Sequence, residues 1–94
     1  MARSSKTGRR RIRFELNAEP GSEVCVAGSF NGWDPAATPL MDKDGAGRFR
    51  RTMLLPPGHY EYKFVVNGTW CVDPVCETWR ANDQGSLNSV LDVK

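Results

Sequence analysis

The residues of this 94-residue chain best suited to binding chemistry are two tryptophans, each placed at a turn. Trp33 lies in the Phe-Asn-Gly-Trp-Asp-Pro run of residues 30–35, and Trp70 follows the Asn67-Gly68 dipeptide. Asn-Gly favours a tight hairpin turn because both residues tolerate positive φ. An indole is a large flat surface that binds by stacking rather than by reacting. The two positions predict one exposed platform made of both rings, and the alternative is that both rings belong to the core.

Catalysis by this chain is not predicted. A glycosidase needs two carboxylates about 5 to 10 Å apart across a cleft, and no motif fixes such a pair here. The acidic residues considered all lie in turns, where Asp and Glu are common: Asp34, Asp44, Asp73, Glu77 and Asp83. A nucleophile–histidine pair would have to use His59, the single histidine, and no glycine-rich phosphate loop opens a helix. We therefore expect a non-enzyme that needs no cofactor.

The three cysteines favour a reducing compartment over a disulfide framework. Cys25 lies between two valines and is expected to be buried. A disulfide between Cys71 and Cys76 is the alternative for the other two. A zinc site needs about four ligands at recognisable spacing, so one histidine without a Cys-x-x-Cys motif predicts no metal.

Positive charge is concentrated near the start of the sequence. Residues 1–13 carry six basic residues and no acidic one, whereas the remainder carries 13 − 6 = 7 basic and 11 acidic residues. A nucleic-acid-binding domain places its positive charge on the folded face, so no specific nucleic-acid ligand is expected. We expect residues 1–10 to form a disordered basic tail and residues 11–94 to form one domain. A tail that acts as a weak anchor for nucleic acid is the alternative.

The hydrophobic pattern predicts neither membrane insertion nor export. No apolar run approaches the roughly 20 residues of a membrane span, and the N-terminus lacks the apolar segment of a secretory signal. We expect a cytoplasmic location.

Short strands separated by turns account for most of the expected domain. Apolar and polar residues alternate over 11–16, 48–55 and 60–66, which is the two-residue period of a half-buried strand. Further short strands are expected at 24–27, 40–41, 70–72 and 89–93, whereas 73–86 is expected to be irregular. Seven or eight short strands with frequent turns predict an all-β antiparallel sandwich.

Three motifs in consistent order and spacing resemble the glycogen-binding domains of carbohydrate-binding module family 48. The first runs from Val24 to Trp33 and resembles an apolar strand followed by Gly-Ser-Phe-Asn-x-Trp. The second is the strand from Pro57 to Phe64, followed by Asn-Gly-x-Trp and Asp-Pro, and the third is Gly-Ser-Leu-Asn-Ser-Val at 85–90. The match covers roughly residues 12–94. Related domains occur in the AMP-activated protein kinase β subunit and as early-set domains of isoamylases and branching enzymes.

This resemblance implies an immunoglobulin-like β-sandwich that binds α-1,4-linked glucans: glycogen, starch, maltooligosaccharides and cyclodextrins. By position, Trp33 and Trp70 would stack on sugar rings, while Lys63 and Asn88 would hydrogen-bond to hydroxyls. Indole suits the C–H face of glucose, and asparagine both donates and accepts whereas lysine only donates. The alternatives are an ordinary outward-facing lysine and an asparagine that ties down its own loop.

Two features depart from the family pattern. Kinase-type members carry a leucine just before the closing glycine, where this sequence has Gln84. The loop between Asp73 and Asn88 is also about one residue longer and contains Trp79. We include Gln84 and Trp79 among the candidate binding residues, with loop packing as the alternative for Trp79.

The main rival function is protein interaction. The same apolar patch would then pack against a kinase or a glycoside hydrolase of the amylase type. A partner bound tightly, with no effect of glucan, would favour this rival.

Overall fold

In the computed structural model, residues 8–76, 78–82 and 85–94 are described, and these form seven β-strands without a helix. The strands are β1 (Arg10–Asn17), β2 (Val24–Gly28), β3 (Arg48–Leu55), β4 (Gly58–Val66), β5 (Thr69–Cys71), β6 (Trp79–Ala81) and β7 (Leu87–Val93). Every pairing between them is antiparallel. The predicted all-β antiparallel class is therefore confirmed, with seven strands.

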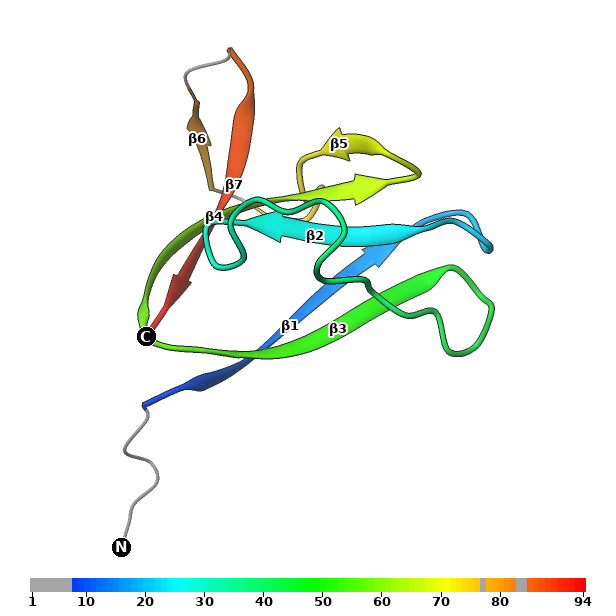
Figure 1. The fold of residues 1–94 in the computed structure, drawn as a ribbon, viewed down its shortest axis with the longest axis horizontal. Coiled ribbons are helices and arrows are strands. Elements are labelled where there is room, and N and C mark those ends of the chain that lie inside the picture. Colours follow the sequence, from blue (N-terminus) through cyan, green and yellow to red (C-terminus); the bar gives the residue numbers. More distant parts are fainter. Residues whose placement is uncertain (1–7, 77, 83–84) are drawn as a thin grey trace, which may run out of the picture.

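Two sheets face one another (Figure 1). β1 and β3 pair along their whole length as a two-stranded sheet. The other sheet has the order β2-β4-β7-β6, with β5 also paired to β4. β4 is thus the central strand. Its residues 62–66 pair with β2 on one edge, while residues 58–62 pair with β7 and residues 64–66 with β5 on the other.

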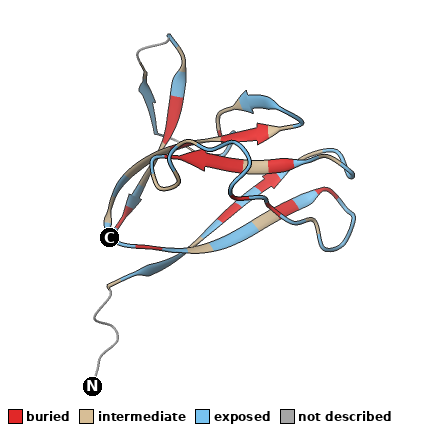
Figure 2. Ribbon diagram, in the orientation of Figure 1, coloured by how far each residue is buried: buried red, intermediate tan, exposed pale blue. Residues whose placement is uncertain are grey.

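The core lies between the sheets, where the buried segments of β1, β2 and β4 meet (Figure 2). Alternation along β1 turns Phe14 and Leu16 inward, and Phe49 of β3 joins them. From β4, Tyr62 and the fully buried Phe64 face the same interior. The rings of Phe14 and Tyr62 meet edge to face with centroids 5.2 Å apart, so aromatic packing joins the two sheets.

The chain between β2 and β3 crosses from one sheet to the other. The Leu40 N–H donates to the Val24 carbonyl at 2.8 Å, and then Met41 and Arg50 exchange two backbone hydrogen bonds of 2.9 Å. The short strand expected at 40–41 is thus reduced to isolated bridges. Leu40 itself is buried, so this crossing closes one side of the core.

Some local features differ from the expectations. β6 lies within the stretch 73–86, for which the sequence predicts irregular structure, because three residues are too few to display an alternation. β1 already includes Arg10, while residues 1–7 of the expected tail lie outside the described part.

The cysteines also differ from the expectations. Cys25 is half-buried rather than buried, because its two valine neighbours occupy the inward positions of β2. All three cysteines are free, so Cys71 and Cys76 form no disulfide.

Candidate functional site

A groove follows the gap that β4 leaves between β5 and β7. Tyr62 pairs with Ser89 of β7, whereas Phe64 pairs with Cys71 of β5, so Lys63 lies where the two neighbouring strands part. The groove has a volume of about 850 Å³ and lies on the outer face of the five-stranded sheet. It brings together four of the residues singled out in the sequence: Trp33, Trp70, Lys63 and Asn88.

Trp70 is positioned by strand pairing. It lies in β5 directly opposite Val65 of β4, and opposed residues of an antiparallel pair share one face of the sheet. The indole therefore covers Val65, which is only 5% exposed, while 43% of Trp70 itself remains exposed. The ring is held in place and still open to a ligand.

Trp33 is positioned by the loop after β2. Its φ is 60°, a value that residues other than glycine seldom adopt, and its N–H donates to the Gly28 carbonyl at 2.9 Å. The Asn31 amide braces this loop with three bonds of 3.0 Å: it accepts from Gly28 N–H and donates to the Val26 carbonyl and to Thr38 Oγ1. Trp33 is consequently half-buried at the rim of the groove.

Gly28 permits the close approach of this loop to β4. A Cβ at this position would lie 2.6 Å from both the Glu61 carbonyl oxygen and the Phe30 ring. Ser29, the next residue, donates its N–H to the Glu61 carbonyl at 2.9 Å, and its hydroxyl accepts from the Glu61 N–H at 3.2 Å. The Trp33 loop is thus fastened to the strand that carries Lys63.

The polar side chains of the groove are already connected to one another. Lys63 Nζ donates to Ser86 Oγ at 2.5 Å. Asn88 is only 7% exposed. Its Nδ2 donates to Glu61 Oε1 at 3.0 Å, and its Oδ1 accepts from Asn82 Nδ2 at 3.2 Å. A direct bond from Asn88 to a ligand therefore stays a prediction.

Among the groove residues that sequence reasoning missed are Glu61, Arg80 and Asn82. Arg80 Nε lies 3.4 Å from Glu61 Oε2, and Arg80 is opposite Asn88 in the β6–β7 pair. The available signal was the placement of Arg80 between Trp79 and Ala81, which assigns it to the other face once a strand is assumed. Because the sequence predicts irregular structure over 73–86, it gives no strand from which the face of Arg80 could be assigned.

Trp79 and Gln84 are not brought to the groove. Trp79 is opposite Ser89, whose side chain is fully buried on the inner face of the sheet. Trp79 therefore shares the inner face rather than the groove face, and it is 45% exposed in a strand whose three residues are all exposed. Gln84 lies outside the described residues.

A buried carboxylate supports the groove from the inner side. The Tyr62 hydroxyl donates to Asp73 Oδ2 at 2.7 Å, and the Asp73 N–H donates to Ser89 Oγ at 3.0 Å. These bonds join β4 and β7 to the segment after β5. Burial, and then the hydrogen bond to Asp73 and its charge, raise the pKa of Tyr62 far above its usual value.

In the described part of the chain, no three His, Cys, Asp or Glu side chains are grouped as metal ligands. No helix there is long and apolar enough to cross a membrane.

A β-sandwich with two indoles and hydrogen-bonding side chains along one open groove defines a carbohydrate-binding module, because stacking and polar contacts together are what a sugar ring requires. The chain belongs to the family described as the glycogen recognition site of AMP-activated protein kinase, whose model matches residues 11–94. This is a family of non-catalytic glucan-binding domains.

Several curated proteins are similar to this chain. FLOURY ENDOSPERM 6, a chloroplastic protein of Oryza sativa subsp. japonica, is 37% identical over 81% of the chain and 14% of its own length. The human 5'-AMP-activated protein kinase subunit beta-2 is 36% identical over 82% of the chain and 27% of its own length. The chloroplastic PTST homolog 2 of Arabidopsis thaliana is 46% identical over 57% of the chain and 10% of its own length. The chain thus spans about a quarter or less of these relatives.

Proposed function

We propose that the groove binds α-1,4-linked glucan, with Trp33 and Trp70 stacking on glucose units of one chain. The observation that carries this proposal is that both indoles line the same open groove with Lys63, on the outer face of one sheet. A linear glucan presents a repeated C–H face with hydroxyls along its rim. The C–H face fits the indoles, and the hydroxyls fit Lys63, Glu61 and Arg80.

The expected affinity is modest. If each indole buries about 100 Å² of apolar surface, at about 25 cal/mol/Å² each ring contributes about 2.5 kcal/mol. Loss of rotational and conformational freedom offsets part of this gain. A dissociation constant between about 10⁻³ and 10⁻⁵ M follows. Such a site suits a module that holds its protein on a polymer with many repeats.

The matched pair Trp70→Ala and Trp79→Ala tests the proposal. The two tryptophans have almost the same exposure, 43% and 45%, and both lie in three-residue edge strands. Titration with maltoheptaose is measured by calorimetry. We expect Trp70→Ala to weaken binding by about tenfold or more, whereas Trp79→Ala, on the other face, retains the wild-type affinity.

An equal loss of maltoheptaose affinity in Trp70→Ala and Trp79→Ala would refute the assignment of the groove as the glucan site. No heat with wild-type protein and maltoheptaose, β-cyclodextrin or glycogen would refute glucan binding by this chain. Co-sedimentation with glycogen provides the second measurement for the same proteins.

We also propose that the chain itself has no catalytic role and that it acts together with a protein partner. Support comes from relatives that are named as subunits of a kinase. A kinase or a glycoside hydrolase is the predicted partner class, and the cytoplasmic location expected from the sequence stays a prediction. Co-purification of an enzyme with the tagged full-length protein, in the presence and absence of maltoheptaose, tests the partner.

A further inference from the structure

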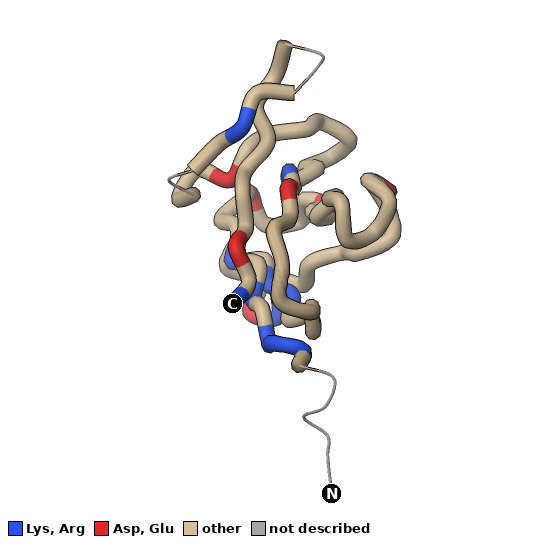
Figure 3. The backbone as a smooth tube through the Cα atoms, turned by 90° about the vertical axis from the view of Figure 1, so that its left-hand side faces the viewer, with Lys and Arg blue, Asp and Glu red and all other residues tan. Residues whose placement is uncertain are grey.

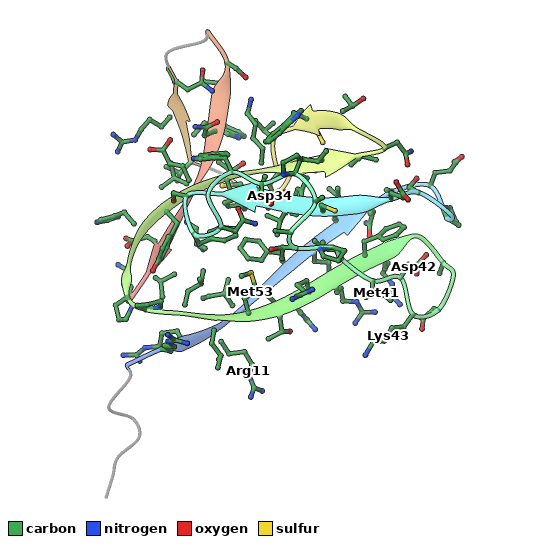
Figure 4. All side chains as sticks on the ribbon, viewed as in Figure 1. Arg11, Asp34, Met41, Asp42, Lys43 and Met53 are labelled. Atoms are coloured by element: carbon green, nitrogen blue, oxygen red, sulfur yellow. The ribbon has the colours of Figure 1, made fainter. Side chains whose placement is uncertain are left out.

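A second, smaller cleft of about 490 Å³ lies on the other side of the sandwich. Arg13 of β1 and Arg50 and Thr52 of β3 contribute to it from the outer face of the two-stranded sheet. Met41 and Lys43 contribute from the loop before β3, and both side chains lie beside the start of β3, where Met41 bridges Arg50 (Figure 4). Three segments of the chain thus converge on one concave site.

The face around this cleft is strongly basic. Alternation places Arg11, Arg13, Arg48 and Arg50 on the outer side of the β1–β3 pair, with Glu15 as the acidic member. Figure 4 shows Arg11 directed away from the sandwich and Met53 directed into it. In the side view, basic positions gather around the start of β1 (Figure 3). The sandwich therefore carries a positive face opposite the glucan groove.

Internal ion pairs leave much of this charge available. Arg48 lies 3.8 Å from Asp44, while Arg13 lies at the outer limit of pairing with Glu15, at 4.0 Å, and keeps 60% of its side chain exposed. Within the described part of the chain, Arg50 and Lys43 have no side-chain hydrogen bond or ion pair. Exposed pairs of this kind are weak, so an incoming anion can compete with them.

The side-chain types point to carboxylate or phosphate groups as the ligand. Guanidinium groups have a planar fork that matches both anions with two parallel hydrogen bonds. Arg13 and Arg50 sit diagonally across the β1–β3 pair, at a spacing that successive acidic side chains of an extended segment can reach. Thr52, opposite Arg13, adds a hydroxyl donor.

Protein is a better match than nucleic acid. Met41 is 59% exposed and Leu54 is 57% exposed on or beside this face, and arginine and methionine are enriched in protein interfaces while lysine is depleted. No aromatic side chain among the described residues lines the cleft for base stacking.

We propose that this cleft is a second binding site, which takes an acidic segment of a partner protein through carboxylate or phosphate groups held by Arg13, Arg50 and Lys43. The site shares no residue with the glucan groove and lies on the opposite face of the sandwich. The proposal is therefore independent of the glucan-binding function, and one chain can occupy both sites at once.

The test compares Arg50→Ala with Lys94→Ala, which removes the same charge from the C-terminal residue outside the cleft. The probes are a peptide of glutamates separated by serines, the same peptide with phosphoserine, and an oligothymidylate of equal length, at low and high salt. We expect at least one of the two peptides to bind. Arg50→Ala should lower its affinity about fivefold or more, and Lys94→Ala should leave that affinity unchanged. Binding should weaken with added salt.

The phosphoserine and glutamate peptides distinguish the two sources of negative charge. Retained maltoheptaose affinity in Arg50→Ala shows that the variant is folded. The proposal is overturned if neither peptide binds, if Lys94→Ala costs as much as Arg50→Ala, or if the oligothymidylate binds more tightly than both peptides.

Discussion

At the scale of single residues, the glucan groove depends on side chains beneath it that contact no ligand. Asp73 is 8% exposed. One of its oxygens accepts from the Tyr62 hydroxyl and the other from the Val75 N–H at 3.0 Å. Because burial of a carboxylate is unfavourable unless its oxygens are hydrogen-bonded, Tyr62 is expected to contribute to folding through its hydroxyl as well as through its ring.

Tyr62→Phe removes that donor while keeping the ring. We expect the free energy of unfolding at neutral pH to fall by about 1–3 kcal/mol, the usual cost of leaving a buried acceptor without a partner. Tyr60→Phe is the matched control, because the Tyr60 hydroxyl donates to the Pro56 carbonyl at an exposed site. Urea denaturation followed by tryptophan fluorescence measures the free energy of unfolding of both variants. An equal decrease in Tyr62→Phe and Tyr60→Phe would contradict the role assigned to Asp73.

The same pair of residues predicts an alkaline pH dependence. Because the folded pKa of Tyr62 is raised, folded Tyr62 keeps its proton above pH of about 10, where unfolded tyrosine releases it. Its contribution to stability is thus complete below that pH and is lost as pH rises further. The difference in unfolding free energy between wild type and Tyr62→Phe should therefore shrink above pH of about 10. Burial also raises the pKa values of Cys25 and Cys71. Both cysteines are present in wild type and in Tyr62→Phe, so their titration does not contribute to this difference in unfolding free energy.

At the scale of elements, the loop after β2 determines where Trp33 lies. Its Asn31 amide reaches β2 twice, through Val26 and Gly28, and also reaches Thr38 at the far end of the loop. One side chain therefore closes the loop on itself. The loop should respond as a unit when that side chain is removed.

Asn31→Ala is expected to lower the free energy of unfolding by about 1–3 kcal/mol, because buried backbone groups lose their partners. It should also weaken maltoheptaose binding by about threefold or more, because Trp33 is no longer held in a binding-competent position. Asn17→Ala, at an exposed end of β1, is the control. Calorimetry and urea denaturation on both variants decide the matter. An Asn31→Ala protein with unchanged glucan affinity would show that Trp33 needs no brace.

Prediction from the sequence located the strands that an alternation or a neighbouring turn marks, including the three-residue β5, and it missed β6. The alternation in β1, β3 and β4 located these strands to within about two residues, because eight or nine residues display the period clearly. β6 has three residues, and its pairing with β7 depends on contacts that alternation does not reveal. Arg80 and Asn82 were missed for this reason, whereas Trp33 and Trp70 were found because turn signals mark their positions locally.

Tertiary context also changed the interpretation of residues whose strands were correctly placed. Asn88 is in the groove, but its amide is engaged by Glu61 and Asn82 from two other segments. Arginines of β1 and of β3 come together only through the β1–β3 register. Neither arrangement follows from a local pattern, since each joins residues distant in the sequence.

At the scale of the whole molecule, the sandwich separates two binding faces. The glucan groove lies outside the five-stranded sheet, and the basic cleft lies outside the β1–β3 sheet, with the aromatic core between them. A domain built in this way can attach a partner protein to a polysaccharide without competition between the two ligands. Electrostatic and packing interactions between distant sites without shared partners are usually additive.

We therefore expect maltoheptaose to bind with the same dissociation constant in the absence and in the saturating presence of the acidic peptide. Coupling between the sites should stay below about twofold, because no described residue lines both the groove and the cleft. Calorimetric titration of maltoheptaose into the protein and into the protein–peptide mixture measures this directly, with Arg50→Ala as the control in which the added peptide binds more weakly. By reciprocity, the affinity for the peptide must change by the same factor as the affinity for the sugar. A larger coupling, of either sign, would mean that ligand binding on one face rearranges the core, and the rigid separation of the two faces would then be wrong.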